Sequence, residues 1–256
     1  MTKVSFGAET KNKLKGGIII KDNTMPDNKW TFDKNVTDCF DDMLERSIPQ
    51  YDVMRDAVYN LGCKTLNKHK NISVLDIGCS NGLSLERYVH KYGALGRYKG
   101  IDVSEPMLQQ AKERFQGYTK INIVNIENMD LRVNFPIDTY SLIQSVLTIQ
   151  FIPIEYRQNI IQNIYNHLIL GGTFIMVEKV LGNCSELNEI MIDEYLSLKE
   201  SNGYSKDQIE RKRLSLEGVL VPVTSNWNID LLKQAGFRKI DVFWRWMNFE
   251  GYICIK

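Results

Sequence analysis

The sequence is poor in the residues that build metal centres and disulfide frameworks. It has 3 histidines, none with a partner at metal-ligand spacing, and 5 cysteines at scattered positions with no CxxC pair. These absences argue against a structural zinc site and against a disulfide-stapled fold. We therefore expect no bound metal, and we expect most cysteines to be small buried apolar residues.

Long apolar runs and an excess of charge of one sign are also missing. No run approaches the ~18 apolar residues that a membrane-spanning helix needs, and the N-terminal stretch has no apolar core of the kind found in signal peptides. The formal net charge is +1, without the basic footprint usual in nucleic-acid-binding proteins. We expect a cytoplasmic protein with no membrane contact and no extensive nucleic-acid surface.

What the chain does have is the composition of an ordinary folded protein. Its 256 residues are 43% hydrophobic and 25% charged, which suits one α/β domain with helical additions. Residues 1–27 are rich in Lys, Gly and Asn, and we expect a flexible N-terminal arm there. Residues 28–256 are predicted to form a single domain.

Hydrophobic periodicity predicts an alternation of helices and short buried strands. Residues 30–64 have helical spacing that Pro49 interrupts. The strands that follow are predicted at 73–78, 99–103, 121–126, 140–147 and 173–180, and the helices at 83–92, 105–116 and 154–168, the last ended by Gly171-Gly172. Two helices form an insertion at about 185–220, and a helix at 228–236 precedes two adjoining strands, 239–246 and 249–255. This order predicts an α/β, Rossmann-like fold: a mostly parallel seven-stranded sheet with an antiparallel C-terminal hairpin and added helices.

One loop of this pattern carries candidate chemistry. Asp76-x-Gly78-x-Ser80-x-Gly82 connects the first strand of the sheet to the helix after it. Glycines there let the backbone approach a ligand closely, and ligands of open α/β sheets bind beyond the carboxyl ends of the strands. About twenty residues further on, Asp102 ends the second strand, where a carboxylate can accept both ribose hydroxyls of a nucleoside.

Several interpretations of this loop compete. A dinucleotide site is disfavoured because GxGxxG is absent. Gly78 to Gly82 formally matches the G-x-S-x-G of serine hydrolases, but the only histidines are His69, His90 and His167, and that fold needs one late in the chain. A structural glycine turn is the plain alternative. The motif of S-adenosyl-L-methionine binding fits best, because it also accounts for Asp102.

The chain outside the loop resembles a known family. From about residue 28 to 256 it is similar to the carboxy-S-adenosyl-L-methionine synthases, a branch of the class I methyltransferase fold. Besides the loop, the resemblance rests on Trp30-Thr31-Phe32-Asp33, Pro49-x-Tyr51, Thr148-x-Gln150-Phe151, Glu178-Lys179, Asn202-Gly203-Tyr204-Ser205, Lys212-Arg213-x-x-Leu216-Glu217, Gly236-Phe237 and Asn248-Phe249.

The resemblance implies a reaction and a set of partners. Members of this family take S-adenosyl-L-methionine and prephenate, and they release carboxy-S-adenosyl-L-methionine and phenylpyruvate. The sulfonium acidifies its methyl group so that an ylide can form, and this carbon captures the carbon dioxide that prephenate loses. The product serves tRNA wobble uridine modification. A homodimer is also implied.

The resemblance assigns roles to particular residues. Arg213 would pair with the transferred carboxylate, for which its planar fork is suited, although Glu210 to Arg213 also reads as a solvated charge run. Tyr51 matches a tyrosine that contacts the cofactor. The remaining expected cofactor contacts are Asp76, Gly78, Cys79, Ser80, Gly82, Asp102, Val103, Glu127, Asn128 and Val146.

Three positions depart from the family pattern. Val103 and Val146 stand where the family has asparagines (a one-residue shift places Ser145 there instead), and Glu127-Asn128 stands at the acidic position after the third strand. Two alternatives therefore stay open. One is an ordinary methyltransferase that acts on a small molecule or tRNA. The other is a non-catalytic nucleoside-binding protein.

Overall fold

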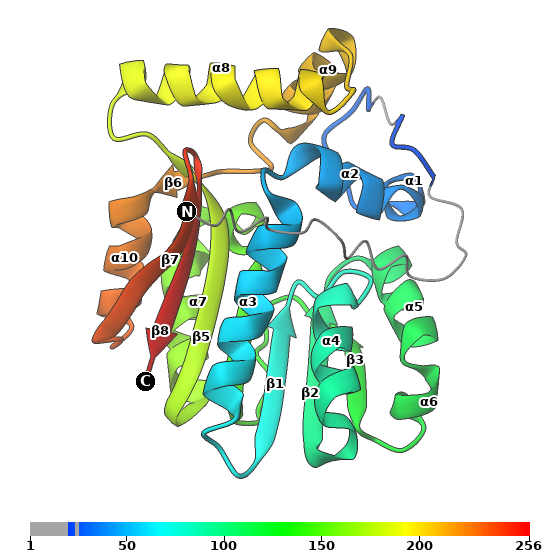
Figure 1. Ribbon diagram of the computed structural model, residues 1–256, viewed down its shortest axis with the longest axis vertical. Helices are drawn as coiled ribbons and strands as arrows, with labels where there is room; N and C mark the ends of the chain where they lie inside the picture. The colour runs from blue at the N-terminus through cyan, green and yellow to red at the C-terminus, as the bar shows by residue number, and fades with distance from the viewer. Residues whose placement is uncertain (1–19, 24–25) are drawn as a thin grey trace, which may run out of the picture.

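The molecule consists of a central sheet with helices on both faces and a layer of helices across one end. The computed structural model describes residues 20–23 and 26–256. The carboxyl ends of the parallel strands point toward the helical layer, which includes the long helix α8 at the top of the view (Figure 1).

The sheet is mostly parallel and ends in an antiparallel pair of strands, as predicted. Along its main path the order is β3-β2-β1-β4-β5-β8-β7, with β1 to β5 parallel and the last two strands antiparallel. A short strand, β6, pairs with β5 and adds to the seven strands predicted. The bounds are β1 Ile72–Ile77, β2 Gly96–Asp102, β3 Val124–Asn128, β4 Tyr140–Val146, β5 Leu168–Leu181, β6 Val223–Thr224, β7 Lys239–Trp246 and β8 Phe249–Ile255.

Helices cover both faces of this sheet with their apolar sides. One face packs against α3 (Tyr51–Leu66), α4 (Leu83–Tyr92) and α5 (Glu105–Arg114), and the other against α7 (Ile154–His167) and α10 (Ser225–Gln234). Smaller pieces are η1 (Gly93–Leu95), α6 (Gln116–Thr119) and η2 (Ile149–Phe151). Among the helices that the structure describes, none combines the length and apolar character needed to cross a bilayer.

The helical layer comes from two distant parts of the chain. Its first part is α1 (Lys34–Asp38) and α2 (Phe40–Ser47), and its second part is the predicted insertion, α8 (Ser185–Ser201) and α9 (Lys206–Leu216). The predicted break at Pro49 is present, because α2 ends at Ser47 and α3 begins at Tyr51 after the left-handed Gln50. Ser205 and Gln208 form a capping box that fixes the start of α9.

The prediction that Gly171-Gly172 ends a helix is wrong. Helix α7 ends at His167, and Leu168 already pairs with Tyr140 as the first residue of β5. Leu168 is 2% exposed, so burial and strand pairing outweigh the local helical pattern. The glycines instead lie where the β4–β5 register shifts, and a Cβ at Gly172 would stand 2.8 Å from the Ile169 carbonyl oxygen.

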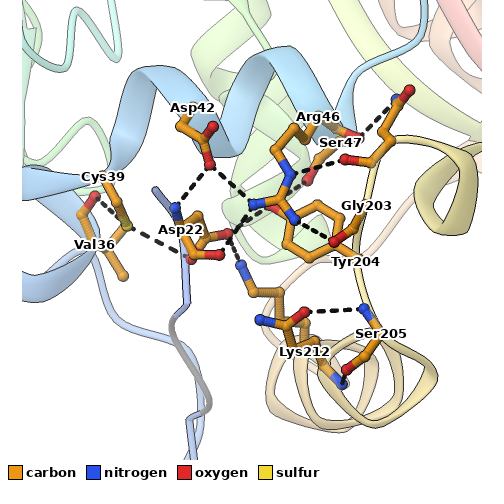
Figure 2. Close-up of polar contacts among 12 residues, drawn as sticks. Asp22, Val36, Cys39, Asp42, Arg46, Ser47, Gly203, Tyr204, Ser205 and Lys212 are labelled. Carbon is orange, nitrogen blue, oxygen red and sulfur yellow. Dashed lines mark hydrogen bonds and ion pairs between the residues drawn. The ribbon is translucent and has the colours of Figure 1, made fainter. Parts of the chain in front are cut away.

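Most of the predicted flexible arm, residues 1–27, lies outside the described residues. Asp22 is described, and it is held in place rather than flexible. Asp22 is fully buried; its carboxylate pairs with Lys212 and accepts a 2.5 Å hydrogen bond from Tyr204 Oη (Figure 2). Its backbone N donates to Asp42 Oδ2 at 2.7 Å, and its carbonyl accepts from Arg46 at 3.1 Å. This residue therefore ties α2 to α9.

Asp22→Ala should destabilise the protein strongly, because it leaves the ammonium of Lys212 buried without its carboxylate. We expect a loss of about 3–5 kcal/mol in the free energy of unfolding, measured by denaturant titration. Asp27→Ala is the matched control, since Asp27 pairs with Arg211 at a position where its side chain is 81% exposed. That variant should lose less than about 1 kcal/mol. Equal losses in the two variants would contradict a stabilising role for the buried pair.

Candidate active site

The loop after β1 has the conformation that its small residues predict. Gly78, Ser80 and Gly82 have φ angles of 68°, 48° and 85°, so alternate residues are left-handed. A Cβ at Gly78 would lie 2.1 Å from Thr148 Oγ1, so this position accepts only glycine. The loop thus packs closely under the end of β4 while its upper side faces a cavity.

Asp102 holds this loop from the neighbouring strand. Its Oδ2 accepts a hydrogen bond from Ser80 N at 2.9 Å, and its Oδ1 accepts one from Ser104 N at 2.9 Å. Burial raises the pKa of Asp102, and these backbone hydrogen bonds oppose the rise. Each carboxylate oxygen keeps a further lone pair, so Asp102 can also accept hydroxyl groups of a ligand.

Asp76 is the more buried of the two acids and has unused hydrogen-bonding capacity. It is 2% exposed, and its Oδ2 has no hydrogen-bond partner among the described residues. Burial raises its pKa to about 7. An unpaired buried acceptor on the wall of a cavity fits a ligand that brings a donor or a cation. The site residues therefore fit a charged, hydroxyl-bearing nucleoside.

A cavity of about 620 Å³ lies between the strand ends and the helical layer. Nine of the predicted site residues line it: Tyr51, Asp76, Gly78, Cys79, Ser80, Asp102, Val103, Val146 and Arg213. They come from β1, β2, β4, α3, α9 and the loops between them. The fold thus brings together residues more than 160 positions apart in the chain.

Three predicted residues do not line this cavity. Gly82 starts α4, where a Cβ would meet the Phe115 ring at 2.6 Å. Glu127 pairs with Lys99 at 3.0 Å. The amide of Asn128 donates to Glu105 at 3.2 Å. The cavity wall beyond β3 is formed instead by Met129, Asp130, Leu131 and Arg132.

Cys79 contributes backbone rather than a reactive thiol. Its side chain is 4% exposed, and burial raises the pKa of the thiol well above its ordinary value. The sulfur lies against Gly100, whose added Cβ would stand 2.9 Å from Sγ. A neutral buried thiol of this kind is a poor nucleophile.

Arg213 faces the cavity from α9 with its fork already engaged. Its Nε and Nη2 donate to Glu210 at 2.8 and 2.7 Å, and its side chain is 47% exposed. Across the cavity, Tyr51 Oη accepts a 3.3 Å hydrogen bond from Arg55, which also lines it. The charge run of α9 is therefore both an ion-paired surface and a cavity wall.

Three lysines of the cavity wall were not predicted as site residues: Lys179, Lys199 and Lys212. Lys199 and Lys212 are 6% and 3% exposed, and both sit on helices whose inward residues recur at helical spacing. On α8 these residues are Ile192, Tyr195, Leu196 and Lys199, and on α9 they are Ile209, Lys212, Arg213 and Leu216. This helical spacing could have assigned Lys199 and Lys212 to the inner face, and Lys179 and Lys212 also stand in motifs on which the family resemblance rests.

Known proteins with similar sequence and structure support this architecture. A methyltransferase domain family matches residues 74–172. An O-methyltransferase family protein from Burkholderia thailandensis superposes with a TM-score of 0.62 at 14% identity, covering 88% of this chain and 60% of that one. Human N-acetylserotonin methyltransferase in complex with SAM gives 0.55 at 14% identity, covering 87% and 55%. Fold and site together define a transferase of the class I S-adenosyl-L-methionine-dependent methyltransferases, with S-adenosyl-L-methionine as its cofactor.

The sequence relatives narrow this class. The carboxy-S-adenosyl-L-methionine synthase of Methylococcus capsulatus is 35% identical over 226 residues, covering 88% of this chain and 93% of that protein. The synthase of Helicobacter pylori is 36% identical over 240 residues, covering 91% and 97%. The chain belongs to the carboxy-S-adenosyl-L-methionine synthase family.

Asp76 should make the stability of the ligand-free protein depend on pH. Its pKa of about 7 in the folded state exceeds the value of about 4 of an unfolded chain, so the folded state binds more protons between these values. Its contribution to stability is full below about pH 4 and is lost as the pH rises through about 7. From pH 5 to pH 8, the wild type should lose about 2–3 kcal/mol of unfolding free energy relative to Asp76→Asn.

Denaturant titrations of both proteins at the two pH values measure this difference. The exposed Asp230→Asn serves as the control and should follow the wild type. Parallel pH profiles for the wild type and Asp76→Asn would show that Asp76 is ionised throughout.

Proposed function

We propose that this chain is a carboxy-S-adenosyl-L-methionine synthase that uses prephenate as the second substrate. The observation that carries the proposal is that Arg213 lines the same cavity as the Gly78–Ser80 loop and Asp102. Methyl transfer to a neutral acceptor gives no reason for a guanidinium there. A reaction that creates a carboxylate next to the sulfonium does.

The proposed reaction balances without an added oxidant or metal. Prephenate loses carbon dioxide and hydroxide as its ring becomes aromatic, which leaves phenylpyruvate. The methyl carbon of S-adenosyl-L-methionine loses a proton and bonds to the carbon of carbon dioxide. The proton and the hydroxide form water. The sulfonium supplies the acidity of the methyl group; the residues of this chain bind, orient and exclude water.

Residues of the loop and its neighbours would hold the nucleoside. Asp102 would accept the ribose hydroxyls with its spare lone pairs, and the unpaired Oδ2 of Asp76 would accept a donor from the methionine part. The backbone of Gly78 to Ser80 would lie next to the same end of the ligand, with Tyr51 above it. No residue described here is a strong nucleophile, so catalysis would rest on orientation and electrostatics.

Arg213 would bind the carboxylate that is transferred. Its fork now pairs with Glu210, and a second, longer contact reaches Glu217 at 3.7 Å. Both glutamates are more than half exposed, so exchange of these partners for a substrate carboxylate costs little.

Arg213→Ala should lower carboxyl transfer by roughly 10²–10³-fold, the range typical of losing one charge-stabilising donor. The assay incubates protein, S-adenosyl-L-methionine and prephenate, and follows carboxy-S-adenosyl-L-methionine by mass and phenylpyruvate by absorbance. Arg211→Ala is the matched control on the same helix, since Arg211 pairs with Asp207 and Asp27 and does not line the cavity. Equal transfer in the two variants would remove Arg213 from the reaction.

The same assay separates the competing functions. Wild-type protein that binds S-adenosyl-L-methionine but forms no carboxylated product, and instead methylates a small molecule or tRNA, would be an ordinary methyltransferase. Binding with neither reaction would favour a non-catalytic nucleoside-binding protein. Val103 and Val146 replace asparagines of the family pattern and both line the cavity, so the assay has to distinguish these functions.

The proposed product is an activated carboxymethyl donor. We propose that it serves carboxymethylation of tRNA wobble uridine by a separate enzyme in the cytoplasm. This chain itself would not need to bind the tRNA.

We also propose a homodimer, as the family resemblance implies. Exposed apolar residues on the insertion support it: Leu187, Ile190 and Leu214 are 49%, 65% and 47% exposed. Light scattering of the purified protein should give twice the mass of one chain at micromolar concentration. Leu187→Glu/Ile190→Glu should reduce this to one chain mass, whereas Leu170→Glu on β5, 87% exposed, should not. A single-chain mass for the wild type would contradict the dimer.

A further inference from the structure

Three lysines of the cavity wall, Lys179, Lys199 and Lys212, lie close to the rings of two tyrosines. Lys179 and Lys199 both approach the Tyr195 ring, with their Nζ atoms 4.5 and 5.6 Å from its centroid. Lys199 Nζ is also 5.4 Å from the Tyr204 ring, and Lys212 Nζ is 4.8 Å from the same ring. Strand β5 and helices α8 and α9 therefore bring three ammonium groups against the same two tyrosine rings.

Only one of these three ammonium groups has a carboxylate partner. Lys212 pairs with Asp22, as Figure 2 shows. Among the described residues, neither Lys179 nor Lys199 has a carboxylate within 4.0 Å of its ammonium or a hydrogen bond to it. Their recorded contacts are with the faces of Tyr195, Tyr204 and Phe249. Lys199 is only 6% exposed, so little of its side chain is in contact with solvent.

Two neighbouring cations without a counter-ion are costly inside a protein. Burial lowers the pKa of Lys179 to about 8. Burial and the charges of Lys212 and Lys179 lower the pKa of Lys199 to about 8, although the carboxylate of Asp22 opposes the change. Aromatic faces offset a part of this cost only. An anion placed between the two ammonium groups would relieve it, and the cavity that both line is open to a ligand of that charge.

We propose that Lys179 and Lys199 form a carboxylate-binding subsite, which receives the acid group of the second substrate that is not transferred. The inference rests on the proposed function for the identity of that substrate. Prephenate has two carboxylates: the one on the ring is lost as carbon dioxide, and the one on the pyruvyl side chain remains in phenylpyruvate. Arg213 serves the first, and the two lysines hold the second.

Two carboxylate sites, one at Arg213 and one at the two lysines, explain why the cavity contains cations on separate helices and strands. Arg213 is on α9, whereas Lys179 is on β5 and Lys199 on α8. A dianion held at both ends has a fixed orientation, so its departing carboxylate faces the methyl carbon. Tyr195 lines the same cavity and adds apolar surface for the aromatic ring that the reaction creates.

Phenylpyruvate tests the subsite because it contains only the retained carboxylate. Calorimetric titration of protein loaded with S-adenosyl-L-methionine should detect its binding, and phenylacetone, which lacks the carboxylate, should bind at least about tenfold more weakly. Lys179→Met and Lys199→Met should each weaken phenylpyruvate at least about tenfold and leave the affinity for S-adenosyl-L-methionine within about twofold. Lys179→Arg should restore most of the affinity because it restores the charge.

Lys91→Met is the matched control. Lys91 Nζ also lies over two tyrosine rings, at 5.8 Å from Tyr59 and 5.4 Å from Tyr92, but it is exposed on α4 and does not line the cavity. This variant should bind phenylpyruvate as the wild type does. If Lys199→Met fails to fold, Lys179→Met decides the question, because Lys179 is only partly buried.

The failure of this proposal can be told apart from the failure of the proposed function. Lysine-dependent binding of phenylpyruvate without any carboxylated product would support the subsite and reject the synthase. Turnover of prephenate with an unchanged KM in Lys179→Met and Lys199→Met would reject the subsite and support the synthase. Unchanged phenylpyruvate affinity in a Lys179→Met/Lys199→Met protein that still binds S-adenosyl-L-methionine overturns the subsite outright.

Discussion

The carboxylate of Asp102 fixes the geometry on which the nucleoside site depends. One oxygen holds the turn after β1 through Ser80 N, and the other holds the start of α5 through Ser104 N. Adjacent parallel strands end at the same edge, so a single side chain can restrain two connections at once. Gly78 and Ser80 both have left-handed backbone angles, which are costly for residues other than glycine. The hydrogen bond between Ser80 N and Asp102 on the next strand holds the turn in this conformation. The ligand therefore meets a surface that is already formed.

The opposite wall of the cavity is formed by the helical insertion rather than by the strand ends. The sheet supplies the nucleoside side from its strand ends, whereas α8 and α9 supply Lys199, Lys212 and Arg213 from an insertion after β5. Methyltransferases of this class share the sheet, and their substrates vary with what covers it. The positive charges on α8 and α9 suit a substrate that contains carboxylate groups. Under the proposed function, the specificity of the enzyme would reside in residues that the common fold does not need.

The sequence predicted the sheet and the turn well because both depend on local pattern. The helix 83–92 and the strands 239–246 and 249–255 have the predicted bounds. Gly171-Gly172 was misassigned because pairing between Leu168 and Tyr140 is not visible in local periodicity. The cationic wall was missed for a related reason. A lysine at helical spacing looks solvated until the fold covers it, and Glu127 and Asn128 were expected at a cavity that the next few residues line instead.

Asp22 bears on where the folding unit begins. The similarity to the synthases covers 88% of this chain for one relative and 91% for another, and from sequence the domain was expected to start at residue 28. Yet the carboxylate that compensates Lys212 comes from ahead of that point. A shortened protein that starts at Trp30 would keep every residue of the nucleoside site. In that protein Lys212 would lose the carboxylate that now neutralises it, so the domain start expected from the sequence leaves out a residue that the charge balance of the cavity wall requires.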